Sequence, residues 1–364
     1  MIYLDNGATT FPKPEVVYQA MDTFARTGAV NAGRGAYAAA RAADQMIKNV
    51  RTGLISLMDA REQAQVVLTP SVTIALNQII YGQAWTEKSI AYVSPYEHNS
   101  VLRPLDVLSK KIGFQVLELP LAEDLSIDLA KTAAMFEENP PSFVAVTAVS
   151  NVTGYILPHR EIFRLARRYG AFNLLDGSQA VGLIRLPFAQ TMADAICFAG
   201  HKTLYGPFGI AGFLIKNSAK LQVTLAGGTG TKSEDLAMPT SLPGSMEAGS
   251  KDTVAIAGLE AALKWLPSVK PLEHERAMAA HFIEEAGKID GVELYCAPGG
   301  LQNQAGVVSF GVRGFKAIEV AAILDNKYDI AVRAGHHCAA LIHQHLGSNK
   351  YAGTVRVSPG YFNT

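Results

Sequence analysis

The chain has few cysteines and no excess of charge of either sign. Its 364 residues include three cysteines, Cys197, Cys296 and Cys338, and no Cys-x-x-Cys pair. This pattern argues against a disulfide framework and against a thiolate zinc site. The 32 basic side chains balance the 32 acidic ones. Such a balance offers no general attraction for a nucleic-acid backbone or an anionic membrane surface, so we expect neither as a partner.

Long apolar runs are also absent. No uncharged apolar run approaches the roughly 18 residues that a membrane-spanning helix needs. The start of the chain, Met1 to Asp5, has neither the basic region nor the apolar region of a secretory signal. We therefore expect a cytoplasmic protein. With 49% hydrophobic and 18% charged residues, the chain can bury a sizeable core, and its length predicts a large α/β domain with a smaller companion.

Short β-branched segments alternate with segments of helical period from about residue 65 to residue 216. This alternation is typical of a mostly parallel sheet covered by helices. Polar residues that follow the strands should lie where open α/β sheets bind ligands. The predicted strands are 65–68, 90–93, 143–146, 172–175, 195–198 and 210–215.

The pattern changes after the Gly- and Ser-rich stretch 227–250. Beyond it we predict helices at about 253–266 and 272–288, then strands near 291–296 and 305–312. We interpret the chain as a large α/β domain over 14–250 and a small α+β domain over 251–364, which also includes 1–13.

The first dozen residues are predicted to be extended. A helix is expected only after Pro12 and Pro14, because proline is tolerated before a helix and in its first turn. We expect this segment to pack on the second domain or to line the cleft.

Lys202 follows a predicted buried strand and precedes a Gly-Pro turn, in the segment Ala199-Gly200-His201-Lys202-Thr203-Leu204-Tyr205-Gly206-Pro207. Most lysines are surface charges. A lysine after a hydrophobic strand is instead partly desolvated, which lowers its pKa and leaves the amine able to form a Schiff base with an aldehyde.

Asp176 ends another predicted strand, in Leu174-Leu175-Asp176-Gly177. One interpretation is a helix N-cap. The other uses Lys202 as well: pyridoxal phosphate (PLP) forms an imine with a lysine and needs a carboxylate beside its pyridine nitrogen. Together the two residues suggest PLP.

Two further strand ends carry polar residues. The segment from Leu68 to Thr73 lies at a predicted strand-to-helix junction, where backbone amides and hydroxyls can hold a phosphate. Ser and Thr caps are common, so this signal is weak alone. His98 follows the next strand and could lie over a cofactor ring, although a loop histidine is more often merely solvated.

Cys338 lies in Arg333-Ala334-Gly335-His336-His337-Cys338-Ala339. A metal site is one interpretation, but the crowded ligands lack structural-zinc spacing. The other is a nucleophilic thiolate beside an arginine and imidazoles. Cys197 and Cys296, inside predicted apolar strands, better fit inert buried thiols. Arg356 could hold a substrate carboxylate or form a structural salt bridge.

Taken together, these motifs resemble the class V aminotransferase family, and within it the cysteine desulfurase and selenocysteine lyase branch. The resemblance runs from Tyr3-Leu4-Asp5-Asn6-Gly7-Ala8-Thr9-Thr10 to Arg356 and Tyr361. The Gly-His-Lys and Tyr-Gly-Pro elements match the Schiff-base signature of the family. The Arg-x-Gly-x-His-Cys-Ala loop marks its SufS-like group. The resemblance implies the PLP-dependent transferase fold (fold type I), with a mostly parallel seven-stranded sheet and a small α+β C-terminal domain.

The resemblance also implies a role for each matching residue. Lys202 would bind PLP, Asp176 would pair with its pyridine nitrogen, and His98 would stack on its ring. The other implied cofactor contacts are Gln179 and Asn151 on the ring hydroxyl side, the Val72 amide, Thr73 and His201 on the phosphate, and Ser250 on the phosphate from the other subunit. The last contact implies a homodimer.

The implied reaction converts L-cysteine to L-alanine. Arg356, with Arg333 and Asn151 nearby, would bind the substrate, and Lys202 would remove the Cα proton. Cys338 would then attack the substrate sulfur and keep it as a persulfide. An acceptor protein or a small thiol would take the sulfur onward.

Alternatives remain open from the sequence. The same residues suit a selenocysteine lyase, or another class V reaction in which Cys338 is idle. A different class would be a non-catalytic metal or persulfide carrier that uses Cys338 and the histidines 336, 337, 343 and 345. Two positions depart from the family pattern: Ala199 replaces a phosphate-binding Ser or Thr, and Ile74 replaces a common acid. The chain ends at Thr364, where relatives continue into a further helix.

Overall fold

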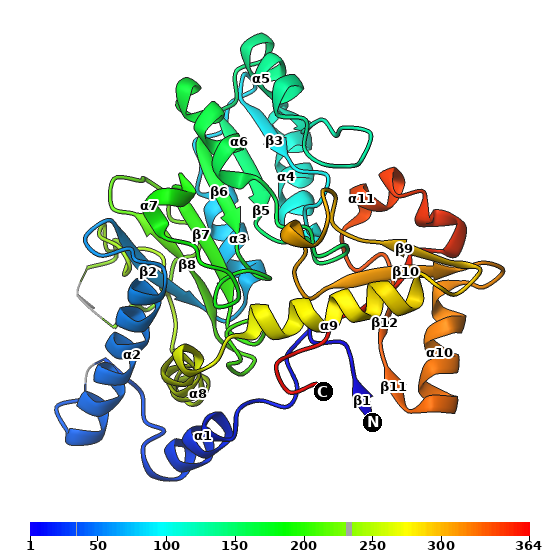
Figure 1. Cartoon of the computed structure of the whole chain (residues 1–364). Coiled ribbons are helices and arrows are strands. Elements are labelled where there is room, and N and C mark those ends of the chain that lie inside the picture. The colour runs from blue at the N-terminus through cyan, green and yellow to red at the C-terminus, as the bar shows by residue number, and fades with distance from the viewer. Residues whose placement is uncertain (34, 231–234) are drawn as a thin grey trace.

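A computed structural model describes residues 1–33, 35–230 and 235–364, so residues 231–234 of the predicted Gly- and Ser-rich stretch lie outside the described residues. Its centre is a seven-stranded sheet (Figure 1) with the strand order β2-β8-β7-β6-β5-β3-β4. Only β8 runs antiparallel to its neighbours, and the other described pairings are parallel. The strands are β2 (Ala64–Thr69), β3 (Ile90–Val93), β4 (Gln115–Glu118), β5 (Phe143–Thr147), β6 (Phe172–Asp176), β7 (Ala195–Ala199) and β8 (Ala211–Lys216).

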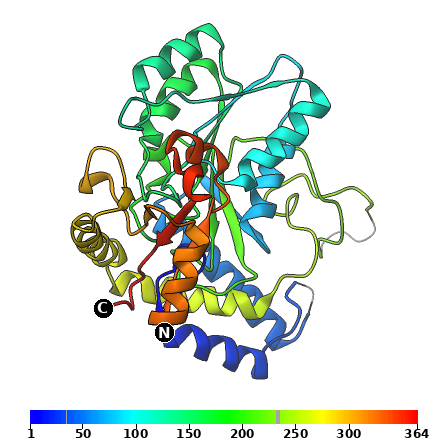
Figure 2. The same cartoon turned by 90° about the vertical axis from the view of Figure 1, so that its right-hand side faces the viewer.

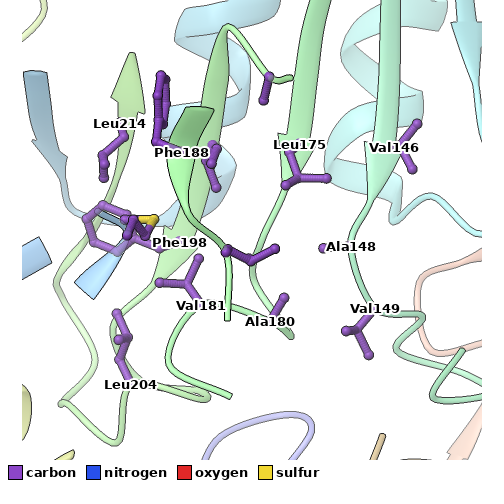
Figure 3. Packing of buried hydrophobic residues seen from close by; sticks show 14 of the residues in the cluster. Val146, Ala148, Val149, Leu175, Ala180, Val181, Phe188, Phe198, Leu204 and Leu214 are labelled. Atoms are coloured by element: carbon purple, nitrogen blue, oxygen red, sulfur yellow. The ribbon is translucent and has the colours of Figure 1, made fainter. Parts of the chain in front are cut away.

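Helices cover both faces of this sheet, because successive strand residues point to opposite faces and both sets are apolar. Val66 and Leu68 of β2 join the core on one face, whereas Val67 joins the core on the other. Figure 3 shows Leu175, Phe198 and other side chains of the first core. The helices that pack on this first core are α2 (Ala38–Leu57), α5 (Leu129–Glu138), α6 (His159–Ala166) and α8 (Thr253–Trp265). The opposite face of the sheet is covered by α3 (Val72–Tyr81) and α4 (Asn99–Ile112).

A second, antiparallel sheet has the order β12-β13-β10-β9. Phe310, Val355 and Val357 form the centre of its own apolar core, against Ala317 at the start of α10. This sheet stands beside the first in Figure 1. Its elements are α9 (Pro271–Ala286), β9 (Val292–Tyr295), β10 (Val308–Val312), α10 (Ala317–Tyr328), β12 (Arg333–Gly335), α11 (Ala340–His345) and β13 (Thr354–Val357).

The N-terminal segment is extended, as predicted, and joins the two parts of the fold. Strand β1 (Ile2–Tyr3) pairs in parallel with β11 (Ile330–Ala331), and helix α1 (Glu15–Thr27) begins directly after Pro14. Figure 2 shows the two chain ends on the same side of the molecule. There the Asn363 side-chain amide donates to the Tyr3 carbonyl at 3.0 Å.

The sequence predicted six of the seven strands of the large sheet and missed β4. The remaining described elements are short: α7 (Phe188–Thr191) and the 3-10 turns η1 (Arg167–Tyr169), η2 (Leu266–Ser268), η3 (Leu301–Asn303) and η4 (Ser348–Tyr351). In the part of the chain that the structure describes, no helix combines the length and apolarity needed to cross a bilayer. The seven-stranded fold is confirmed, and the domain boundary at residue 250 stays a prediction.

Candidate active site

Lys202 lies in the turn that follows β7, at the carboxyl edge of the sheet. Burial, the largest cause, lowers the pKa of its amine to about 8, and the positive charges of Arg356 and Arg333 act in the same direction. Asp176 and Cys338 act electrostatically in the opposite direction. The structure thus gathers four of the predicted site residues around this amine, although they are distant in the sequence.

Asp176 ends β6, the neighbour of β7, and its backbone is paired with that of Cys197. The carboxyl group is 3% exposed. Its Oδ1 accepts hydrogen bonds from the backbone N–H of Ser178, at 2.9 Å, and from the Ser178 hydroxyl. A single hydrogen-bonded turn follows, in which the Gly177 carbonyl accepts from the backbone N–H groups of Ala180, at 2.9 Å, and Val181, at 2.8 Å. Asp176 thus caps this one turn, and no regular helix follows it. Among the described residues Oδ2 has no hydrogen-bond partner, which leaves one oxygen for a ligand.

His98 follows β3 and caps helix α4. Its Nδ1 accepts from the Ser100 backbone N–H at 3.1 Å and lies 2.7 Å from the Ser100 hydroxyl. Burial is the main cause that lowers the pKa of His98 to about 4, and the charge of Lys202 adds to it. The imidazole is therefore neutral at pH 7.

The predicted phosphate site lies where β2 leads into α3. Ser71 caps the helix by accepting from the Ile74 backbone N–H at 3.3 Å. The backbone amides of Val72 and Thr73, in the first turn, have no partner among the described residues. The buried Nδ1 of His201 is also unpartnered. A helix N-terminus with free amides is a typical place for a phosphate.

Arg356 and Arg333 come from neighbouring strands of the second sheet, where the two residues are paired in register. Arg356 is 1% exposed. Its Nη2 pairs with the Asp5 carboxylate, its Nη1 donates to the Asn151 carbonyl at 3.2 Å, and its buried Nε has no partner. A buried guanidinium that keeps a free N–H can bind a carboxylate.

Cys338 lies on the loop after β12. Arg333 donates from Nη2 to its Sγ at 3.7 Å. The Cys338 carbonyl accepts from the Asn99 backbone N–H at 2.6 Å, which ties the cysteine loop to the helix that His98 caps. Both His337 and Cys338 have positive φ angles, 48° and 59°. Non-glycine residues rarely adopt this conformation, and it is often found at functional sites.

The histidines near Cys338 form hydrogen bonds of their own. Burial is the main cause that lowers the pKa of His337 to about 2 and of His343 to about 4, so both rings are neutral at pH 7. Among the described residues, no three His, Cys, Asp or Glu side chains converge as metal ligands would. The histidines have these partners: Asn349 for His336, Thr354 for His337, Ser348 for His343 and Glu118 for His345.

The other two cysteines are poor nucleophiles. Cys197 is buried within β7, and burial raises the pKa of its thiol well above the usual value. Cys296 lies just after β9 and is partly exposed, so its predicted place inside a strand is wrong. Burial nevertheless raises its thiol pKa to about 11.

Two of the residues predicted to contact the cofactor, Gln179 and Asn151, already donate a hydrogen bond to a backbone carbonyl. The Gln179 side-chain amide donates to the Gly7 carbonyl at 2.7 Å, and the Asn151 side-chain amide donates to the His337 carbonyl at 2.7 Å. Ser250 is exposed and lies in the wall of a cavity with Ile74. Its predicted contact from the other subunit stays a prediction.

The sequence predicted that the N-terminal segment packs on the second domain or lines the cleft, but it did not reveal which site residues the segment contacts. The His201 carbonyl accepts from the Thr10 backbone N–H at 3.1 Å, from the Thr9 hydroxyl at 3.0 Å and from the Lys13 ammonium at 2.8 Å. Burial lowers the pKa of Lys13 to about 7. Because Asp5 also pairs with Arg356, this segment contacts both the predicted substrate-binding arginine and the turn that holds Lys202. Only the motif near residues 3–10 could have indicated these contacts.

A buried lysine and a strand-end carboxylate at the edge of a doubly covered sheet define an α/β enzyme that works with a bound cofactor. The chain belongs to the class-V aminotransferase family, whose family model matches residues 2–364.

Individual proteins support the same assignment. A probable cysteine desulfurase of Methanothermobacter thermautotrophicus is 31% identical, over 100% of this chain and 91% of that protein. The apo structure of a cysteine desulfurase from Thermococcus onnurineus NA1 superposes with a TM-score of 0.89 and 28% identity, over 100% of this chain and 90% of the other. The Escherichia coli cysteine desulfurase CsdA has a TM-score of 0.85 and 26% identity, over 100% and 90%.

Enzymes of this family use PLP, and so does this protein. The residues present fit the cofactor on three observations. Asp176 keeps a free oxygen, His201 has an orphaned buried nitrogen, and the first amides of α3 are unpaired. The free Asp176 oxygen can accept a hydrogen bond from the ring N–H. The His201 nitrogen and the α3 amides can form hydrogen bonds with the phosphate.

Proposed function

We propose that this protein is a PLP-dependent cysteine desulfurase. It would convert L-cysteine to L-alanine and keep the sulfur on Cys338 as a persulfide. The observation that carries the proposal is the position of Cys338, which acts electrostatically on the Lys202 amine and contacts Arg333 through its sulfur. Relatives that share the whole fold carry the name cysteine desulfurase.

Lys202 would hold PLP and, once released by the substrate amine, would remove the Cα proton. When bound, PLP supplies the sink for the electrons of the Cα–H bond. A lysine with its pKa at about 8 has roughly one amine in ten unprotonated at pH 7, several hundred times more than an ordinary lysine. The buried position therefore prepares this side chain as a base.

The cofactor contacts are proposals that rest on the geometry above. Asp176 would pair with the ring nitrogen through Oδ2, and the neutral His98 ring would stack on the cofactor. The phosphate would join the groups at the start of α3 and beside Lys202, namely the Val72 amide, Thr73 and His201. Each of Gln179 and Asn151 donates one amide N–H to a backbone carbonyl and would use its second N–H to reach the ring hydroxyl.

Arg356 would bind the substrate carboxylate. Asp5 and Asn151 occupy its two terminal nitrogens in part, and they fix the plane of the guanidinium while Nε stays free. Arg333 would stand beside the sulfur atom, where a persulfide anion forms. Cys338 would attack the substrate sulfur, and the remaining three-carbon fragment would take up protons and leave as alanine.

We also propose a homodimer in which Ser250 reaches the partner's phosphate, and a cytoplasmic location. Ser250 is exposed and therefore free to contact a second copy. All three cysteines are free, and a nucleophilic thiol needs a reducing compartment. Gel filtration coupled to light scattering would test the dimer.

The proposed activity is tested by alanine formation from L-cysteine with PLP present. The intact protein should form alanine, and Cys338→Ala should not. Cys296→Ala is the matched control and should keep the activity, because burial raises the pKa of that thiol to about 11 and leaves it protonated at neutral pH. Equal alanine formation by the intact protein and Cys338→Ala would contradict the proposal. If neither forms alanine although both bind PLP, cysteine is the wrong substrate, and selenocysteine is the next compound to assay.

A further inference from the structure

A groove of about 320 Å³ opens between helices α3 and α4. The lining residues of α3 follow one another at intervals of four, so they lie along one face of that helix. The lining residues of α4 also include pairs four residues apart. Cys338 closes the end nearest the helix N-termini, because its carbonyl is bonded to the Asn99 backbone N–H. The lining residues are Thr73, Asn77, Tyr81, His98, Asn99, Ser100, Arg103, Pro104, Val107 and Cys338.

Arg103 gives this groove its charge. It is the only arginine, lysine, aspartate or glutamate among the lining residues. Its side chain is exposed and has no hydrogen bond or ion pair among the described residues. Asp106, one turn further along α4, is already paired with Lys110 at 2.8 Å. The guanidinium therefore remains available to an anion in the groove.

The position of Arg103 on α4 also sets its distance from Cys338. Arg103 follows Asn99 by four residues on α4, which corresponds to about 6 Å along the helix axis. Cys338 lies next to Asn99, because its carbonyl accepts from the Asn99 backbone N–H. A molecule with a sulfur atom at Cys338 and an anionic group two to four bonds away would thus meet Arg103.

We propose that this groove binds a small thiol with a carboxylate or sulfonate group, and that this thiol accepts the sulfur from Cys338. The inference rests on the proposed function, because it needs a persulfide on Cys338. A groove of this volume suits a small molecule. Asn77, Asn99 and Tyr81 line the groove, and their polar side chains would contact the carbon chain and the polar groups of the thiol.

The transfer step is balanced without a further reactant. The acceptor thiolate attacks the outer sulfur of the Cys338 persulfide, and a new S–S bond forms while the bond between that sulfur and Sγ breaks. The electron pair stays on Sγ, which leaves as a thiolate and takes up a proton. The acceptor is oxidised from thiol to persulfide, and the cysteine persulfide is reduced to thiol.

The experiment measures alanine formation from L-cysteine by the PLP-loaded protein at increasing concentrations of two thiols of equal length, 3-mercaptopropionate and 3-mercaptopropanol. The anionic thiol should show a KM roughly five- to tenfold lower than the neutral one, as one charge-assisted contact predicts. Arg103→Gln should remove that difference and leave the rate with the neutral thiol unchanged. Lys111→Gln, an equal loss of charge on the same helix outside the groove lining, should keep the difference.

Three results would overturn the inference. Equal KM values for the two thiols in the intact protein would show that the groove does not recognise the anionic group. A preference for the anionic thiol that survives Arg103→Gln would show that another residue recognises it. Alanine formed once per subunit, with a stable Cys338 persulfide that neither thiol discharges, would favour a protein acceptor and leave the desulfurase proposal standing. Absence of any persulfide on Cys338 would instead overturn the proposed function and this inference together.

Discussion

The depressed pKa of Lys202 implies that the site lowers the stability of the PLP-free protein at neutral pH. An ordinary lysine titrates at 10.5, whereas burial lowers the pKa of Lys202 to about 8. At about 1.36 kcal/mol per pH unit, this difference corresponds to about 3 kcal/mol. Lys202→Met keeps most of the aliphatic volume and removes the charge. The PLP-free variant should therefore unfold with a free energy about 3 kcal/mol higher than the intact protein at pH 7.

The sign of the pH dependence makes this prediction specific. Between about pH 8 and 10.5 the unfolded chain holds a proton on this lysine that the folded chain has lost, so the stability of the intact protein rises with pH in this window. The advantage of Lys202→Met should fall from about 3 kcal/mol at pH 7 to less than half of that at pH 9.5. Urea denaturation at both pH values measures it. Lys264→Met, on an exposed ion pair, is the control and should change stability little. A Lys202→Met protein that is no more stable than the intact protein at pH 7 would refute the reasoning.

Three further changes test other contacts of the site. Asp5→Asn should raise the KM for L-cysteine more than it lowers kcat, because Asp5 fixes the plane of Arg356; an unchanged KM in steady-state kinetics would refute this positioning role. Ser178→Ala removes the hydroxyl contact to Asp176 and should weaken PLP binding by about 1 kcal/mol, or roughly fivefold, in a fluorescence titration; equal affinity would show that the backbone N–H of Ser178 suffices. Ala199→Ser should tighten PLP binding by a similar factor in the same titration if position 199 faces the phosphate, and weaker binding would show that the buried hydroxyl finds no partner.

The site residues at the ends of strands could be predicted from the sequence, because each reactive side chain directly follows a recognisable strand. Each of Asp176, Lys202 and His98 follows a short apolar run that is buried on both faces, which is the clearest strand signal a parallel sheet gives. The strand β4 was missed for the opposite reason. It pairs with β3 alone at the edge of the sheet, and its residues are exposed or only partly buried, so no apolar run marks it.

The contacts of the second sheet and of the N-terminal segment could not be predicted in this way. Arg333 and Arg356 face each other only because of the register of β12 on β13. The partner of Arg356 is Asp5, 351 residues away in the sequence, and no local pattern links the two. The help of imidazoles to Cys338 stays a prediction, and the contact of the His337 ring with the Thr354 backbone and hydroxyl likewise has no local sequence signal.

The central claim is that Cys338 receives the sulfur of L-cysteine. The most direct test is the mass of the Cys338 peptide after the PLP-loaded protein reacts with L-cysteine and no acceptor. The account predicts that this peptide gains one sulfur atom, that an alkylating reagent traps it as a persulfide, and that one alanine forms for each Cys338 modified. Alanine formed while the Cys338 peptide keeps its original mass, or sulfur found on Cys296 instead, would contradict the account.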